Sequence, residues 1–322
     1  MPALLAICFI LSGAAGLIYE SIWSRYLGLF VGHSAYAQVI VLVIYLGGMS
    51  AGAAIAARRS DRITQPLIGY AAIEIGVGLL GLFFHQIFQA TTAFAYSSIF
   101  PALAGGWALV TMKWALAALL ILPQSVLLGM TFPLMTSGYL RRVSRDGKEQ
   151  SGRVLGVLYF ANSIGAAVGV LVAGFYLIGA VGLPGTILAA AAINIVVGLT
   201  VYGAARMSPD EMDAFGVLRP PAAESIAAPP PPLMELPILW RVLLAVAAGT
   251  ALSSFMYEIA WVRMLSLVLG SATHSFELML SAFILGLALG AFWVRNRADT
   301  FRDPIRALAV AQWAMGALAR RW

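Results

Sequence analysis

The sequence predicts an all-helical protein that crosses the membrane several times and is built from two related halves. Of its 322 residues, 61% are hydrophobic and only 11% are charged, which leaves too little polar surface for a water-soluble protein. The apolar residues form successive stretches of about 20 or more, enough to cross a hydrocarbon core of ~30 Å as helices. Residues 19–32 also reappear, without a gap, 238 positions further along the chain. Because the stretches lack the alternation of barrel strands, each is expected to be a helix.

The expected membrane spans follow these apolar stretches along the chain. About eight are predicted, with a weaker ninth candidate at 305–320. The eight ranges are 3–30, 35–57, 66–90, 107–138, 152–178, 182–205, 238–268 and 274–295. Residues 3–30 are assigned to a membrane helix rather than a signal peptide, because no basic segment precedes them and their counterpart in the repeat is internal.

Basic residues gather in alternate loops between these spans. The loops that carry Lys or Arg are 58–65, 140–153 and 295–306. The loops that carry neither are 31–34, 91–106, 179–184 and 269–273. Since positively charged loops remain in the cytoplasm, the amino terminus is predicted to be cytoplasmic and the protein to be a multi-pass protein of a bacterial-type inner membrane.

The chain divides into three predicted segments. Residues 1–205 form a six-helix bundle, and 206–237 form a proline-rich cytoplasmic linker that favours extended polyproline II. Residues 238–322 form a second repeat with only two spans and part of a third, so this half is expected to be truncated. An offset of six spans gives both halves the same orientation, as in major-facilitator transporters. The expected fold class is therefore a major-facilitator-like, all-α polytopic membrane protein.

Two carboxylates occupy equivalent positions of the repeat, inside the bilayer. They are Glu20 and Glu258, and a carboxylate there is costly unless it faces a cavity or a partner. Each is a candidate to bind a cationic substrate such as a polyamine or to exchange a proton; the alternative is a packing role through hydrogen bonds to neighbouring helices. Trp23 and Trp261 lie three residues later on the same helix face. They either anchor the helix at the membrane interface or bind an amine through cation–π attraction.

Each of these carboxylates is followed, five residues later, by an arginine. Arg25 and Arg263 are rotated about 140° from their own Glu, which makes pairing within one helix poor. Two interpretations remain open. Either the pairs cross between the halves, as Glu20 with Arg263 and Glu258 with Arg25, or each arginine snorkels to the outer headgroups.

Two further charged residues lie within spans of the first half. Glu74 on the third span and Lys113 early in the fourth either pair or line a cavity, and Glu74 joins the candidate substrate-binding residues. The three histidines show no ligand spacing, and a single cysteine, Cys8, excludes a disulfide framework. No catalytic residue, metal site or cofactor is therefore expected.

Small residues at four-residue spacing allow helices to approach closely in lipid. The glycines with this spacing are Gly48, Gly52, Gly165, Gly169, Gly286 and Gly290. Helix packing is their expected role. Pro123 and Pro133 are expected to kink or break the fourth span.

Three separated motifs resemble the membrane region of membrane-fused spermidine synthases. The motifs lie at 12–20, followed by Trp23 and Arg25, and at 122–134 and 159–175. The resemblance covers about residues 5–205 and 245–316. It implies a major-facilitator-like membrane region, which in these proteins is joined to an aminopropyltransferase domain.

The soluble domain of that family binds its nucleoside substrate on a Rossmann-like sheet, and no stretch here has the pattern of strand, glycine-rich turn and helix. The resemblance therefore implies a non-catalytic membrane domain that handles or transports polyamines or related organic cations. The alternative is a structural or accessory subunit of a larger membrane complex. The expected partners are the lipid bilayer and either other membrane subunits or a separately encoded synthase domain. Nucleic acid is not expected, since the basic residues lie in short loops and signal topology.

Overall fold

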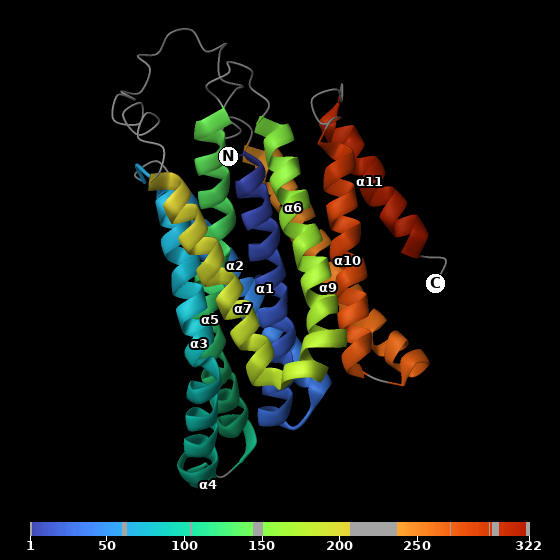
Figure 1. Ribbon diagram of the computed structural model, residues 1–322. Coiled ribbons are helices and arrows are strands. Elements are labelled where there is room, and N and C mark those ends of the chain that lie inside the picture. Colours follow the sequence, from blue (N-terminus) through green and yellow to red (C-terminus); the bar gives the residue numbers. More distant parts are fainter. Residues whose placement is uncertain are drawn as a thin grey trace.

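The computed structural model describes most of the chain and is helical throughout the part that it describes (Figure 1). The described residues are 2–59, 63–103, 105–143, 151–206, 237–270, 272–295, 297 and 303–319. No strand occurs among them, so the all-α prediction is confirmed for these ranges. The proline-rich linker predicted at 206–237 lies outside the described residues, except for its first and last residue.

The helices follow the expected spans closely. In the first repeat they are α1 (Pro2–Val31), α2 (Ser34–Arg59), α3 (Pro66–Phe94), α5 (Gly106–Val143), α6 (Ser151–Val172) and α7 (Ile178–Arg206). Short connecting pieces are the π-helical turns Ala95–Ile99 and Ala173–Leu177 and the short helix α4 (Phe100–Ala102). In the second repeat they are α9 (Pro237–Leu269), α10 (Ala272–Val294) and α11 (Pro304–Ala319). Helix α5 continues through both Pro123 and Pro133, so neither proline ends it.

Seven helical stretches in the described residues are long and apolar enough to cross a membrane. One of them, Val154–Arg206, has 53 residues and at ~1.5 Å per residue would be far longer than a ~30 Å hydrocarbon core if it were straight. It reverses direction near Gly182, whose φ of 67° lies in the left-handed region that glycine tolerates. Helices α6 and α7 therefore lie antiparallel in Figure 1. The chain has the form of a multi-pass membrane protein, and the count of eight spans stays a prediction.

Helix α1 lies at the centre of the first repeat. It packs on α2, α6 and α7, while α3 packs on α5 and α7, and α2 on α5. Glycines allow the closest of these contacts. A Cβ atom at Gly165 or Gly169 would collide with the backbone of α1, and one at Gly52 with the backbone of α5. At Gly48 a Cβ would collide with a side chain of α5. The small residues of this half thus lie at helix contacts.

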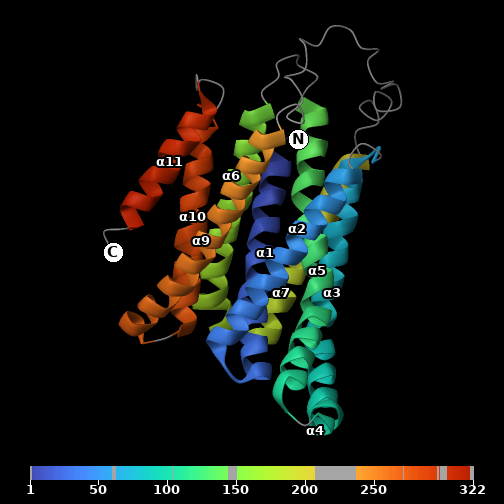
Figure 2. The ribbon, with the colours of Figure 1, turned by 180° about the vertical axis from the view of Figure 1, so that it is seen from behind.

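The second repeat forms an outer layer beside α6 (Figures 1 and 2). Helix α10 packs on α6 and on α9, whereas α11 leans away from α10 in both views. In the apolar stretch of α9 only 6% of the residues are buried, whereas in that of its counterpart α1 the share is 56%. A Cβ atom at Gly286 or Gly290 would meet open space. The second repeat therefore repeats the sequence of the first without its burial.

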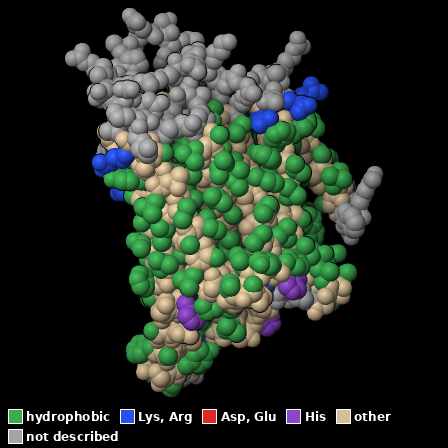
Figure 3. Space-filling view, viewed as in Figure 1, with side chains coloured by type: hydrophobic (Ala, Val, Ile, Leu, Met, Phe, Trp, Pro, Cys, Tyr) green, Lys and Arg blue, Asp and Glu red, His purple; other side chains and the backbone are tan. Residues whose placement is uncertain are grey.

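The two ends of the bundle differ in charge. The space-filling view shows apolar side chains over the middle of the visible face, and Lys and Arg side chains near its upper edge (Figure 3). The amino-terminal end of α1 lies at this upper end (Figure 1). Such polarity is what the positive-inside rule describes, and the cytoplasmic position of this end stays a prediction.

Candidate functional site

Two buried carboxyl groups face the boundary between the repeats. Glu20 of α1 is 4% exposed and Glu258 of α9 is 6% exposed, and the two lie close enough to interact electrostatically. Within the described part of the chain, neither carboxyl forms a hydrogen bond or an ion pair. A buried carboxyl without a donor is costly. A proton or a bound cation would therefore lower the free energy of these two buried carboxyl groups.

A cavity of about 80 Å³ opens beside Glu258, between α2, α9 and α10. Its polar lining residues are Gln38, Glu258, Arg263 and Ser266. Since one water needs only ~10–15 Å³ by the same kind of measure, the cavity can admit a small polar head group. The amide oxygen of Gln38 and the carboxyl of Glu258 provide acceptors for an N–H donor.

Arg263 lines this cavity but is exposed and does not neutralise the site. No ion pair joins it to Glu20 or to Glu258 among the residues that the structure describes. The crossed pair of Glu20 with Arg263 is therefore not formed. An exposed guanidinium at this position agrees with the alternative interpretation, in which the side chain extends toward headgroups.

The two tryptophans of the repeat have different surroundings. Trp23 is fully buried and stacks on Tyr19, with 5.5 Å between the ring centroids. Trp261 is 45% exposed and stacks on Tyr257 at 5.9 Å. Trp23 is thus part of the core of the first repeat, with no exposed ring face for an amine or for the membrane interface, whereas Trp261 is accessible.

Glu74 of α3 belongs to a separate buried network. One of its oxygens accepts a hydrogen bond from Ser12 Oγ of α1, and the other from Asn194 Nδ2 of α7, both at 2.5 Å. The residue is fully buried. Because both oxygens already have protein donors, Glu74 joins three helices and meets the requirement that buried polar groups be hydrogen-bonded. The pair of Glu20 and Glu258 is the better candidate for a ligand.

Arg25 pairs with a carboxylate of the second repeat that has no acidic counterpart in the first. Its Nη2 donates to Glu277 Oε1 of α10, and Ser21 Oγ donates to the same oxygen at 3.3 Å. His274 Nδ1 lies 3.3 Å from the other oxygen of Glu277. The carboxylate is fully buried, while Arg25 is 21% exposed. This ion pair connects the first helix of the chain to the second repeat.

The crossed pair of Glu258 with Arg25 is consequently replaced by the pair with Glu277. The physical reason is that α10 packs on α6 next to α1, whereas α9 lies further out. The sequence shows Glu277 as a charge near the start of its span, but its counterpart in the first repeat is Val39, so a comparison of the halves does not predict its pairing with Arg25.

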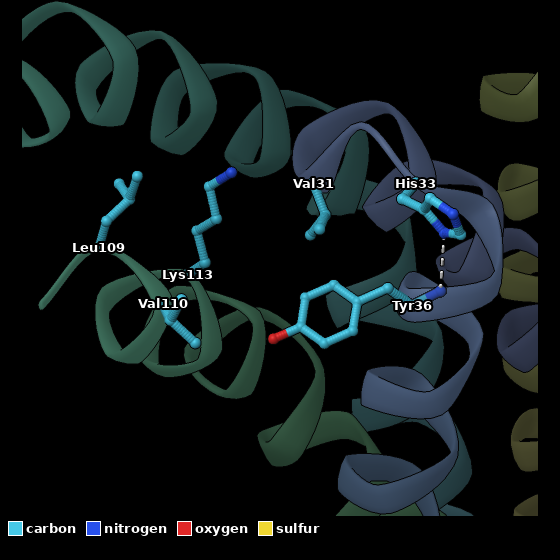
Figure 4. A pocket seen from close by; sticks show the side chains of 6 residues that line it. All are labelled: Val31, His33, Tyr36, Leu109, Val110 and Lys113. Atoms are coloured by element: carbon cyan, nitrogen blue, oxygen red, sulfur yellow. Dashed lines mark hydrogen bonds between the residues drawn. The ribbon is translucent and has the colours of Figure 1, made fainter. Parts of the chain in front are cut away.

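A second cavity, of about 410 Å³, lies where α1 and α2 join, beside the start of α5. Its lining residues are Val31, His33, Tyr36, Leu109, Val110 and Lys113. Figure 4 shows the ring of Tyr36 extending from α2 toward α5, and its hydroxyl accepts a hydrogen bond of 2.6 Å from Trp114 Nε1. Lys113 Nζ lies 5.7 Å from the ring centre of Phe100. Lys113 and Glu74 form no ion pair in the described structure.

No group of three or more His, Cys, Asp or Glu side chains in the described ranges is arranged to hold a metal ion. The two unpaired carboxyls from α1 and α9 therefore remain the feature of the molecule that is most suggestive of a ligand. Comparison of the chain with known protein families, with curated proteins and with solved structures finds no match.

Proposed function

We propose that the protein is a non-catalytic membrane domain that binds an organic cation between Glu20 and Glu258. The observation that carries this proposal is the pair itself: two buried carboxyls from equivalent positions of an internal repeat, within electrostatic range and without a described protein partner. Two like charges in a medium of low dielectric constant repel strongly. A cation between them removes this repulsion and supplies the missing donors.

The chemistry of the site favours an amine of more than one charge. Two carboxylates match two ammonium groups, and Gln38 adds a neutral acceptor at the cavity beside Glu258. The resemblance to membrane-fused spermidine synthases supports the polyamine class. In a major-facilitator-like arrangement the first helix of each half approaches the central axis, which would place the site between the two halves. Because the carboxyls belong to different repeats, any rocking of the repeats would change their separation.

The test is equilibrium binding of labelled spermidine to the purified protein in lipid nanodiscs. Glu20→Gln and Glu258→Gln are each expected to weaken binding about tenfold or more, because a hydrogen bond to a charged group contributes ~1.5–3 kcal/mol. In competition, putrescine should displace spermidine, and 1,4-butanediol, with the same chain but no charge, should not.

The matched control is Glu74→Gln, which removes a buried carboxylate whose oxygens are occupied by Ser12 and Asn194. It should retain spermidine affinity while lowering thermal stability. Unchanged affinity in both Glu20→Gln and Glu258→Gln would contradict the proposal, as would a wild-type protein that binds no amine.

A further inference from the structure

A groove of about 760 Å³ separates α9 from α11 in the second repeat. Its lining residues include Thr250, Ser253, Tyr257 and Trp261 of α9, Phe283 of α10, and Gln312 and Gly316 of α11. Three of these are aromatic, and two of the three are well exposed, Tyr257 at 42% and Trp261 at 45%. No described segment of the chain covers the groove.

The internal repeat identifies the same place in the first half. Each groove residue named above has a counterpart 238 positions earlier. The pairs are Thr250 with Ser12, Ser253 with Ala15, Tyr257 with Tyr19, Trp261 with Trp23, Phe283 with Tyr45, Gln312 with Glu74, and Gly316 with Gly78. Helices α1 and α3, the counterparts of α9 and α11, are bridged there by α7, which packs extensively on both. The groove is thus the space that α7 fills in the first repeat.

Contacts of α7 show how a helix fits this space. Asn194 of α7 donates a hydrogen bond to Glu74. A Cβ atom at Gly78 would lie within 3 Å of α7, at Ala191 and Ile195, so the two helices approach closely. Tyr19 and Trp23 have no exposed surface in this packing. Their identical counterparts in the second repeat are nearly half exposed, and no helix among the described residues covers them.

We infer that the groove between α9 and α11 is the docking site for a transmembrane helix of a partner protein. This helix takes the place that α7 has in the first repeat. It presents a ridge of Gly or Ala to Gly316 and a polar side chain to Gln312, whose amide both donates and accepts hydrogen bonds. The inference does not depend on the cation site.

The polar lining distinguishes a protein helix from lipid as the occupant. The amide of Gln312 forms no hydrogen bond with any residue that the structure describes, and acyl chains offer it none. A second copy of the chain has no equivalent helix to offer, because its own α7 is packed between α1 and α3. A partner helix with a polar residue on a face of small residues can bond to Gln312 and can also approach Gly316 closely.

Helix α10 shows a second such difference between the halves. Gly52 lies against the α5 backbone at Val126, whereas its counterpart Gly290 faces open space. The same holds for Gly48, which lies against Ser125, and for its counterpart Gly286. A partner that brings a pair of helices would cover this face as α5 covers the first repeat.

The experiment uses the purified chain in nanodiscs and a lysine-flanked transmembrane peptide of residues 183–206, the α7 sequence, as a stand-in for the partner helix. A donor dye is attached at Ser253→Cys in a Cys8→Ala background, and an acceptor on the peptide. Energy transfer should saturate as the mole fraction of peptide rises. It should be lost with Gly198→Leu in the peptide, since Gly198 contacts α3 at Ala71 and Ile75.

The matched control peptide carries Gly203→Leu, because a Cβ atom at Gly203 would meet open space. This peptide should bind like the unaltered one. In the chain, Gln312→Leu should raise several-fold the mole fraction of peptide at which energy transfer is half-saturated. Transfer that rises linearly without saturation, or that is equal for the two Leu peptides, would overturn the inference. So would donor self-quenching between chains without peptide, since a second copy would then occupy the groove. Spermidine binding, measured separately, reports only on the cation site.

Discussion

At the scale of single residues, the buried carboxylates of this protein differ in what neutralises them. Glu74 accepts hydrogen bonds from two neighbouring helices, and Glu277 pairs with Arg25. Glu20 and Glu258 have neither kind of partner among the described residues. An unpartnered carboxyl in a membrane is costly. A ligand that donates hydrogen bonds or carries positive charge would therefore stabilise Glu20 and Glu258 the most. Neither the residue type nor its depth in the helix distinguishes the partnered carboxylates from the unpartnered ones; the side chains that face them do.

The ion pair predicts a specific stability effect. Glu277→Leu should destabilise the protein by on the order of 2–3 kcal/mol, because it leaves the Arg25 guanidinium without its counterion. The effect should be below the range for fully buried pairs, as Arg25 is 21% exposed. The double variant Arg25→Met/Glu277→Leu should recover much of the loss. Unfolding in detergent, followed by tryptophan fluorescence, measures both.

The control for this prediction is Glu258→Leu, which removes a buried carboxyl that has no described ion-pair partner. It should be close to neutral or stabilising. A double variant no more stable than Glu277→Leu alone would show that the charge pair is not the cause.

At the scale of helices, equivalent elements have unequal surroundings. The sequence predicts packing roles for glycines in both α2 and α10, and the structure places only those of α2 against another helix. Helix α1 is enclosed by three helices, while its counterpart α9 packs mainly on α10. The pattern of small residues indicates that a helix can be approached closely by another helix. The close contact forms only where a neighbouring helix is present.

This inequality gives a matched pair of substitutions. Gly52→Leu should destabilise the protein by at least ~1–3 kcal/mol, the usual cost of overpacking, because its Cβ collides with the α5 backbone at Val126. Gly290→Leu, at the equivalent position, should have little effect, since a Cβ atom there would meet open space. Thermal unfolding of the two variants in one detergent tests the prediction. Equal destabilisation would mean that α10 is packed against a helix in the same way as α2.

At the scale of the whole molecule, the described structure is a helical bundle with apolar flanks and charge at one end. The last residues of α2 and the first of α3 lie at the same end as the start of α1, and the π-helical turn after α3 lies at the other (Figure 1). With basic residues at the former end, the positive-inside rule predicts that it is cytoplasmic.

Cysteine labelling in whole cells tests this orientation. In a Cys8→Ala background, Ser98→Cys and Thr64→Cys place exposed thiols at opposite ends. A membrane-impermeant maleimide should label Ser98→Cys in intact spheroplasts and Thr64→Cys only after permeabilisation. The reverse result would invert the predicted topology, and equal labelling of both in sealed cells would argue against a single orientation.

Most helix boundaries were predictable from the apolar stretches to within a few residues, because a span needs only a local run of apolar residues. The extension of α3 through Phe94 into the turn Ala95–Ile99 was harder to predict, because Thr and Ser residues interrupt the apolar pattern beyond the expected span of 66–90. The candidate pair of Glu20 and Glu258 was found through the repeat, and the structure buries both side chains; their role as a binding site stays a prediction. The pairing of Arg25 with Glu277 was not predicted, because the first repeat holds Val39 at the position equivalent to Glu277.

By itself the sequence determined that the chain is helical and apolar, that it contains a repeat, and that its positive charge lies in alternate loops. These are local properties, set by composition and spacing along the chain. Only the tertiary structure decided that Arg25 pairs with Glu277, that Glu74 is held by Ser12 and Asn194, and that α9 lies exposed while α1 is enclosed. Such outcomes depend on which side chains from distant segments face one another. Two helices with the same sequence pattern therefore reach different environments when their neighbours differ.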